Sequence, residues 1–279
     1  MIGSAKRISR ITSILMEEGF GLIADAISGN KEVDLDGVEK TLAPKRIKDT
    51  LEKLGPTFVK FGQILGARRD LFPDAYCDEL EKLQAEVAPF SSSQAKAIVE
   101  TELGQPVEKL FKNFYDIPLS AASLAQVHEA TLHTGESVVV KIQRPDAMEL
   151  VEQDLSLLLS LSSKLKALIP LYRKFDVDSL ARYFAMHARE ELNFFLEIKN
   201  AEKLRKCFIN DSYVNIPKIH DDYCTEKILV LEKVNGARFD RLAGPEDVKK
   251  LGLDPEFVVI NLLKLVYEQA YLYGVLHAD

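Results

Sequence analysis

The fold is decided by the stretch Val138-Val139-Val140-Lys141. It lies within residues 137–143, a short run rich in β-branched side chains, and the turn residues His133-Thr134-Gly135-Glu136 separate it from a similar run at 123–132. β-Branched residues favour strands, and a short polar connection that contains glycine favours a hairpin. With a third short run at residues 111–115, the sequence predicts three antiparallel strands.

Helical periodicity dominates the sequence before these strands. Apolar residues recur at three- and four-residue spacing over residues 8–27, and a polar, glycine-containing break follows at 28–37. Four more helices are expected, at residues 45–54, 57–69, 73–84 and 91–103. The last of them has Ser91, Ser92 or Ser93 as its N-cap.

Helices and two further strands are expected after residue 143. The helices span about residues 146–168 and 177–206, with a break near Pro170, and the strands cover residues 218–223 and 227–233. A final helix begins at Pro255, the favoured first position for proline, and runs to Tyr273. The predicted fold class is therefore α+β.

Composition limits the functions that the chain can have. Its 279 residues, 47% of them hydrophobic, suffice for one large or two smaller domains with a sizeable core. A formal net charge of −7 means that the chain lacks the diffuse basic surface that binds nucleic-acid phosphates. We therefore expect no nucleic acid as the main partner, although a local basic patch stays open.

Cysteine usage and the apolar segments bear on where the protein works. Three cysteines lie far apart without a Cys-x-x-Cys pair, which favours a reducing, cytoplasmic setting over a disulfide framework or a zinc site. The longest apolar segments, residues 155–171 and 258–276, carry charged residues and do not have the pattern of a membrane span. The basic residues Lys6, Arg7 and Arg10 form either a peripheral membrane contact or a solvated helix face.

Lys141, at the end of the apolar run in the predicted sheet, is a candidate phosphate-binding residue. A kinase fold uses a lysine at the end of an apolar strand to hold the α- and β-phosphates, and this lysine needs an acidic partner from a helix. Glu197, within the segment 190–197, is the candidate partner. Charged residues are common at the margins of strands and helices, so these two residues alone favour an ordinary solvated role.

The loop before the lysine strand is built from small residues, Ser120-Ala121-Ala122-Ser123, where a protein kinase has glycines. Alanine and serine restrict the turn more than glycine does, but they still present backbone amides and hydroxyl groups to a phosphate. The loop can therefore cover a nucleotide, or it can be a tight hairpin whose small residues pack closely. Taken by itself, the loop favours neither reading.

Lys60 and Gln63 are three residues apart on a predicted helix, which places both on one face. An ammonium and an amide directed at one point suggest a site. Exposed lysines are nevertheless common, so the spacing alone favours a solvated face.

Six motifs occur in the order and approximate spacing of the UbiB-like atypical kinases, also called the aarF-domain family. They are Lys60-Phe61-Gly62-Gln63, the small-residue loop, the Val-Val-Val-Lys strand, Glu191-Leu192-Asn193 with Glu197, Leu229-Val230-Leu231-Glu232, and His277-Ala278-Asp279. The chain resembles this family from about Pro44 to Asp279. The resemblance implies a protein-kinase-like fold with an N-terminal helical extension, binding of ATP or ADP with Mg²⁺, and a link to ubiquinone or other prenyl-lipid metabolism.

The resemblance also implies roles for the matched residues. Lys141 pairs with Glu197, whereas Glu191 faces Lys60 and the metal-phosphate region. Lys60 and Gln63 then occupy the space where a protein substrate lies in an ordinary kinase, so peptide phosphorylation is not expected. Glu191 and Glu197 are six apart and diverge by about 120° on a regular helix, which requires two separate partners.

Three further positions bear on the expected chemistry. Glu232 and Val234 belong to a hinge that binds the adenine edge, or to an ordinary edge strand that ends in an Asn-Gly turn. The family usually has Glu-x-Asp where this chain has Glu191-Leu192-Asn193. Asparagine keeps an acceptor oxygen but lacks the charge, so a metal or lysine contact there is expected to be weaker.

Asp279 matches the residue that orients or deprotonates the attacking group in kinase chemistry. The asparagine and the second aspartate that hold metal in kinases do not occur within residues 1–279, so we expect this fragment to be catalytically silent and to bind nucleotide weakly. The expected domains are a helical extension at residues 1–106, a kinase-like N-lobe with inserted helices at 107–236 and the start of a C-lobe at 237–279. Two hypotheses stay open for the complete protein, an Mg-ATP-dependent ATPase or small-molecule kinase and a non-catalytic nucleotide-gated scaffold.

Overall fold

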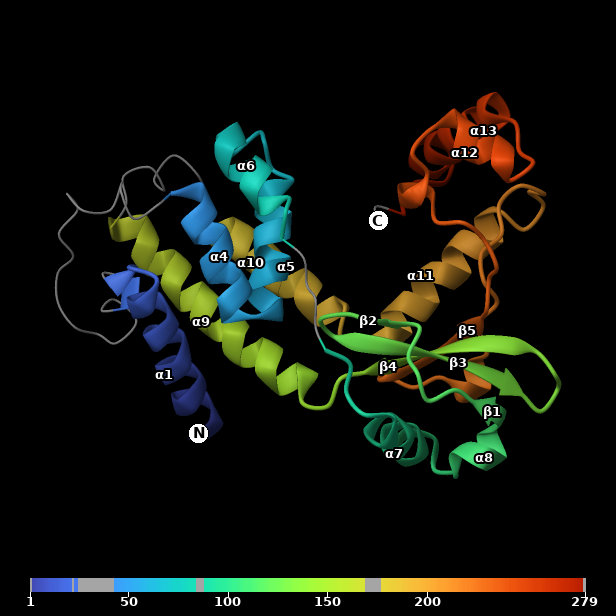
Figure 1. Cartoon of the computed structure of the whole chain (residues 1–279), viewed down its shortest axis with the longest axis horizontal. Coiled ribbons are helices and arrows are strands. Elements are labelled where there is room, and N and C mark those ends of the chain that lie inside the picture. Colours follow the sequence, from blue (N-terminus) through green and yellow to red (C-terminus); the bar gives the residue numbers. More distant parts are fainter. Residues whose placement is uncertain (1, 22, 25–42, 84–87, 169–176, 278–279) are drawn as a thin grey trace. The chain divides into compact units, whose positions relative to one another are not determined.

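The computed structural model describes residues 2–21, 23–24, 43–83, 88–168 and 177–277 (Figure 1). The predicted break at residues 28–37, the break near Pro170 and the residue Asp279 lie outside these ranges. The chain divides into two compact units. One comprises residues 1–99, 116–128 and 141–193, and the other comprises residues 100–115, 129–140 and 194–279. The domain boundaries predicted at residues 106 and 236 stay a prediction.

The first unit is mainly helical. Its helices are α1 (Ile2–Glu17), α4 (Pro44–Leu54), α5 (Pro56–Gly66), α6 (Asp74–Leu80), α9 (Ala147–Leu168) and α10 (Val177–Glu190). Proline begins α4 and α5 because its fixed φ suits the first helical position. Gly55 joins these two helices with a φ of 107°, a conformation that side chains disfavour. The helices predicted at residues 45–54, 57–69, 73–84 and 146–168 are thereby confirmed, within a few residues at their ends.

One apolar core holds α1, α4, α5, α9 and α10 together. It combines Ile11 and Leu15 of α1 with Phe61 of α5, Leu155 of α9 and Phe184 of α10. The rings of Phe61 and Phe184 lie 5.1 Å apart between centroids. Burial of this many large side chains stabilises the unit, since each contributes roughly 1.5–3 kcal/mol when fully removed from water.

A buried ion pair lies beside this core. Arg7 of α1 donates from Nε and Nη2 to the two carboxylate oxygens of Asp154, at 2.7 and 2.9 Å, and Nη2 also donates to the carbonyl oxygen of Leu54 at 2.8 Å. The Asp154 side chain is 0% exposed and that of Arg7 is 12% exposed. Arg7 therefore belongs neither to a membrane contact nor to a solvated face, whereas Lys6 and Arg10 are exposed.

The sheet has the strand order β1-β3-β4-β5, and β2 pairs with β3. Its strands are β1 (Phe111–Phe114), β2 (Ser120–Ala121), β3 (Ala125–Leu132), β4 (Ser137–Gln143) and β5 (Ile228–Glu232). β1 and β2 are both antiparallel to β3, and a register shift interrupts β1 between Phe111 and Asn113. The strands predicted at residues 111–115, 123–132, 137–143 and 227–233 are confirmed. β3 and β4 each begin in one unit and end in the other.

The described part of the second unit contains four further α-helices. They are α8 (Val107–Leu110), α11 (Phe194–Cys207), α12 (Pro245–Lys250) and α13 (Pro255–Tyr267), which continues as a π-helix over Glu268–Tyr273. Asp254 caps α13 by accepting a hydrogen bond from the backbone N–H of Glu256 at 3.2 Å. α7 (Ser92–Leu103) runs from the first unit into the second, and its N-cap is Ser91, whose Oγ accepts from the N–H of Gln94 at 3.3 Å.

Two predictions about secondary structure are wrong. The helix expected over residues 177–206 is broken, because α10 ends at Glu190 and α11 begins only at Phe194. The side chain of Leu192 is buried in the core, and its carbonyl oxygen accepts from Gln143 Nε2 at 2.8 Å instead of continuing the helix. The 120° divergence between Glu191 and Glu197 therefore does not apply, since Glu191 precedes α11.

The second error concerns the strand expected at residues 218–223. Only a single bridge forms there, between Ile219 and Leu231. A 3-10 helix follows at Asp221–Tyr223, whose two leading aspartates disfavour strand pairing.

The described part of the chain contains no helix that is both long and apolar enough to span a bilayer.

Candidate functional site

Lys60 and Glu191 form an ion pair within the first unit. The Nζ atom of Lys60, on α5, lies 3.0 Å from Oε1 of Glu191, in the turn after α10. The two side chains are 43% and 45% exposed, so both charges remain accessible to solvent and to a ligand. The break in the helix makes this possible, because it takes Glu191 out of a regular helical turn.

Gln63 has a different partner from Lys60. Its Nε2 donates to the carbonyl oxygen of Leu83 at 2.9 Å, which ties α5 to the segment that follows α6. The amide donor of Gln63 thus stabilises the packing of the first unit, whereas Lys60 bonds to the turn that carries Glu191.

Gly62 lies between these two residues, and two leucine side chains pack closely against it. A Cβ atom there would come within 2.4 Å of Leu83 Cδ1 and 2.7 Å of Leu51 Cδ1, distances that real Cβ atoms essentially never show. The sequence motif contains this glycine, but only the packing explains it.

Lys141 lies in β4 and is half-buried. Two residues later in the same strand, the buried Gln143 donates to the carbonyl oxygen of Leu192 at 2.8 Å. This bond connects the end of the lysine strand with the turn that contains Glu191. Glu197 is half-buried in the first turn of α11 and belongs to the other unit, so the pairing of Lys141 with Glu197 stays a prediction.

The small-residue loop forms a tight hairpin. Ser120 and Ala121 pair with Val127 and Gln126 across β2 and β3, and the N–H of Ala122 donates to the carbonyl oxygen of Ala125 at 2.8 Å. Ser123 lies within the turn and is half-buried. The hairpin is thereby established, and its covering of a nucleotide stays a prediction.

Two residues that the sequence reasoning missed hold this hairpin. Arg144 donates from Nε to the carbonyl oxygen of Ala122 at 2.8 Å and from Nη2 to that of Ala88 at 3.0 Å. Gln126, fully buried in β3, accepts from the N–H of Phe90 at 3.0 Å. Arg144 follows the lysine strand directly in the sequence, and this position was the only signal available for it.

The predicted hinge begins where β5 ends. The N–H of Glu232 donates to the carbonyl oxygen of Lys218 at 2.8 Å, and Glu232 Oε2 accepts from the N–H of Lys218 at 3.1 Å. Val234 is exposed, and residues 233–238 adopt no regular secondary structure. Both readings of this segment, hinge and edge strand, stay open.

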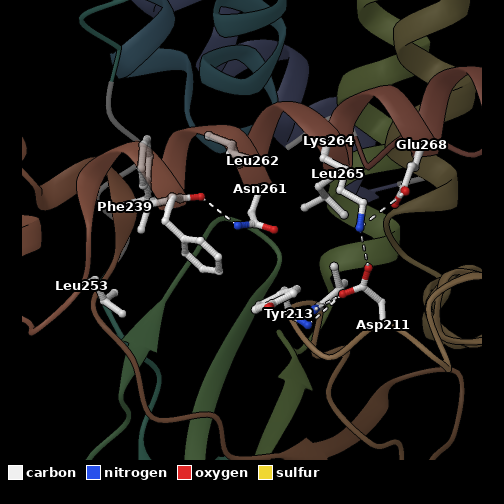
Figure 2. Close-up of a pocket in the computed structure, with 12 residues that line it drawn as sticks. Asp211, Tyr213, Phe239, Leu253, Asn261, Leu262, Lys264, Leu265 and Glu268 are labelled. Carbon is white, nitrogen blue, oxygen red and sulfur yellow. Dashed lines mark hydrogen bonds and ion pairs between the residues drawn. The ribbon is translucent and has the colours of Figure 1, made fainter.

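A cavity of about 300 Å³ lies within the second unit, between α13 and residues 211–214 (Figure 2). Lys264 forms ion pairs with Asp211 and Glu268 along its edge, and the rings of Tyr213 and Phe257 meet there at 5.2 Å between centroids. None of the residues predicted for nucleotide chemistry lines this cavity.

Metal ligands are sparse in the part of the chain that the structure describes. No group of three or more histidine, cysteine, aspartate or glutamate side chains lies close enough there to hold a metal ion. Mg²⁺ commonly uses only one or two carboxylates and takes its other ligands from phosphates and water. The half-exposed carboxylate of Glu191 fits such a role, and Asn193, two residues on, offers an amide oxygen.

Comparison with known proteins extends these observations. Residues 82–279 match the family model of the ABC1 atypical kinase-like domain. The probable protein kinase UbiB of Erwinia tasmaniensis is 36% identical over 235 residues, which make up 84% of this chain and 43% of that protein. The probable protein kinase UbiB of Marinobacter nauticus is 38% identical over 241 residues, covering 84% of this chain and 42% of that protein.

A solved structure shares the fold as well. The complex of Rv3197 with erythromycin, from Mycobacterium tuberculosis, aligns with a TM-score of 0.51 and 26% identity over 78% of this chain and 56% of that one. The chain spans less than half the length of the UbiB relatives that it matches. Its motifs, its mixed helix and antiparallel-sheet architecture and these matches agree, and we conclude that the chain belongs to the UbiB-like family of ABC1 atypical kinases.

Proposed function

We propose that the complete protein is an Mg-ATP-dependent atypical kinase or ATPase that acts in ubiquinone or prenyl-lipid metabolism. The observation that carries this proposal is the Lys60–Glu191 ion pair, which joins two family motifs in space although they lie far apart in the sequence. The names of the UbiB relatives support a kinase activity, and the family supports nucleotide binding.

The proposed roles follow from the chemistry of each side chain. Lys141 holds the α- and β-phosphates, with Glu197 as its partner, as the corresponding lysine and glutamate do in kinases. The hairpin from Ser120 to Ser123 covers the phosphates with backbone amides, and backbone groups near Glu232 and Val234 bind the adenine edge. Mg²⁺ bound with the nucleotide would neutralise negative charge on the phosphates.

Glu191 has two possible partners in this proposal. Without nucleotide its carboxylate binds Lys60. If Mg-ATP bound here, the Glu191 carboxylate would supply one oxygen ligand to the metal, and the Lys60 ammonium would offer a positive charge to the phosphates. Because both side chains are about half exposed, this exchange requires little desolvation.

ATP turnover by the full-length protein tests the proposal. We expect radiolabelled ATP to be hydrolysed or transferred, and Lys141→Ala to abolish the reaction because the phosphates lose their cation. Nucleotide binding without turnover would instead favour a nucleotide-gated scaffold, for which Asn193 in place of the usual aspartate is the supporting observation. For residues 1–279 alone, we expect no turnover.

A peripheral membrane contact is part of the proposed link to prenyl lipids. Lys6 and Arg10 are the exposed basic residues of α1, because Arg7 is bonded to Asp154. We expect Lys6→Glu combined with Arg10→Glu to reduce flotation of the full-length protein with anionic liposomes. Unchanged flotation would reject α1 as the contact while leaving the nucleotide chemistry intact.

A further inference from the structure

We propose that Arg144 is a positioning residue for nucleotide binding, which clamps the small-residue hairpin against the segment of residues 88–90. This inference rests on the proposed function, because the hairpin must cover the nucleotide for the clamp to matter. It concerns a residue that lies outside all six motifs of the family resemblance.

Arg144 binds the hairpin turn through both its backbone and its side chain. Its N–H donates to the carbonyl oxygen of Leu124 at 2.8 Å, and its Nε donates to that of Ala122, also at 2.8 Å. These two carbonyl groups lie within the turn between β2 and β3. The same residue thus fixes the turn at two points and connects it to β4, the strand of Lys141.

The other arm of the guanidinium reaches a distant segment. Nη2 donates to the carbonyl oxygen of Ala88 at 3.0 Å, and the guanidinium carbon lies 5.6 Å from the centroid of the Phe90 ring. The planar guanidinium presents several N–H donors in a fixed fork, so it can hold two carbonyl groups at once. A lysine ammonium keeps the charge but lacks this geometry.

Gln126 holds the same segment from the strand side. Its side-chain oxygen accepts from the N–H of Phe90 at 3.0 Å, and its Nε2 donates to the carbonyl oxygen of Phe90 at 3.3 Å. Because Gln126 is fully buried, these bonds are protected from water. Residues 88–90 are therefore a support held by Gln126, against which Arg144 can hold the turn of the hairpin.

The hairpin depends on this external support because its own side chains are small. Ala121, Ala122 and Ser123 bury little apolar surface, so they contribute little to holding the turn in one conformation. Burial lowers the pKa of Arg144, yet an arginine remains charged at neutral pH, and its hydrogen bonds to carbonyl groups are charge-assisted. Loss of these bonds frees the turn from its binding conformation.

The effect on affinity follows from the population of that conformation. When only a fraction of molecules has the binding-competent turn, the apparent Kd rises by the inverse of that fraction. If removal of the clamp leaves about one molecule in ten competent, the Kd for nucleotide rises about tenfold.

The test uses the full-length protein and the variants Arg144→Met and Arg144→Lys. We expect both to raise the Kd of a fluorescent ATP analogue about tenfold, and amide hydrogen exchange at residues 120–125 to become faster without nucleotide. Arg144→Lys also carries the test if Arg144→Met fails to fold. The matched control is Arg69→Met, which removes an arginine of the same unit that bonds only carboxylates among the described residues. The control should leave the Kd within about twofold of the parent.

The outcomes separate the two proposals. If the parent binds the analogue, Lys141→Ala does not, and both Arg144 variants bind within twofold of the parent, the clamp is overturned and the proposed function stands. If the parent itself fails to bind nucleotide, the proposed function is overturned and the clamp with it. A raised Kd with unchanged exchange at residues 120–125 would also overturn the clamp, since Arg144 would then act in another way.

Discussion

Lys60 Nζ lies 3.0 Å from Glu191 Oε1, which joins α5 to the turn between α10 and α11. Both side chains are nearly half exposed, so their attraction is weakened by water and by salt. We expect a double-mutant cycle with Lys60→Met and Glu191→Gln to give a coupling free energy of about 0.2–1 kcal/mol. Chemical denaturation at low and high salt measures it.

The same two substitutions are expected to lower ATP turnover by the full-length protein strongly, while they lower its free energy of unfolding only slightly. A coupling energy of several kcal/mol would contradict this, because it would mean that the pair is a structural element and not an accessible site.

The Arg7–Asp154 pair should behave in the opposite way. Asp154 is fully buried, so Arg7→Met leaves a carboxylate without its cation in a region that water does not reach. We expect a loss of about 3–5 kcal/mol in the free energy of unfolding, measured by urea denaturation. Asp154→Leu added to Arg7→Met should recover a large part of it, since an apolar pair leaves no stranded charge.

The control for this prediction is an exposed pair. Glu246 and Lys249 lie one helical turn apart on α12 with Oε1 and Nζ 2.8 Å from each other, and both side chains are exposed. Glu246→Gln should change the free energy of unfolding by less than about 0.5 kcal/mol. Equal losses in the free energy of unfolding for Arg7→Met and Glu246→Gln would refute the role that we assign to burial.

Gly62 makes a prediction about packing. Its Cβ would overlap the methyl groups of Leu51 and Leu83, so Gly62→Ala should destabilise the first unit by about 1–3 kcal/mol although alanine favours helices. Thermal melting followed by circular dichroism measures the loss. Gly244→Ala is the matched control, because nothing lies within 4 Å of the added methyl group there. A melting temperature for Gly62→Ala equal to that of the parent would mean that the two leucines move aside at little cost.

The cysteines should differ in reactivity. Burial raises the pKa of Cys77 and of Cys224, so little of either thiol is thiolate at neutral pH. We expect iodoacetamide to alkylate Cys207 first in the native protein at pH 7.5, and labelling of Cys224 to accelerate as the pH rises toward its raised pKa. Peptide mass spectrometry resolves the sites, and unfolding in guanidinium should equalise them. Alkylation of native Cys77 as fast as Cys207 would contradict its burial.

Local sequence signals predicted most of the elements. The β-branched run before Lys141 and the turn at residues 133–136 predicted β3 and β4, and Pro255 marked the start of α13. These signals act over a few residues, so a sequence is sufficient to read them.

The first error arose where a distant contact overrides local preference. Residues 191–193 have ordinary helical neighbours, yet the carbonyl of Leu192 bonds to Gln143, which lies 49 residues earlier in the chain. No pattern in the neighbouring sequence predicts such a hydrogen bond. Arg144 was missed for the same reason, because its importance comes from carbonyl groups 22 and 56 residues away.

The candidate site was predicted as a set of residues, and the structure shows which neighbours the two site residues of α5 contact. Lys60 has Glu191, and Gln63 has the carbonyl of Leu83. Lys60 and Gln63 lie on one helix, as periodicity predicted, but their spacing cannot tell which neighbour each side chain contacts.

Gly62 has a consequence for the history of such chains. The glycine accommodates Leu51 of α4 and Leu83 of the segment after α6, and this packing is required whether or not any reaction takes place nearby. A descendant that had lost its chemistry would still be selected to keep it. In a newly sequenced relative, this glycine therefore indicates only that the fold has been inherited. The charged residues beside it are the ones that indicate an enzyme.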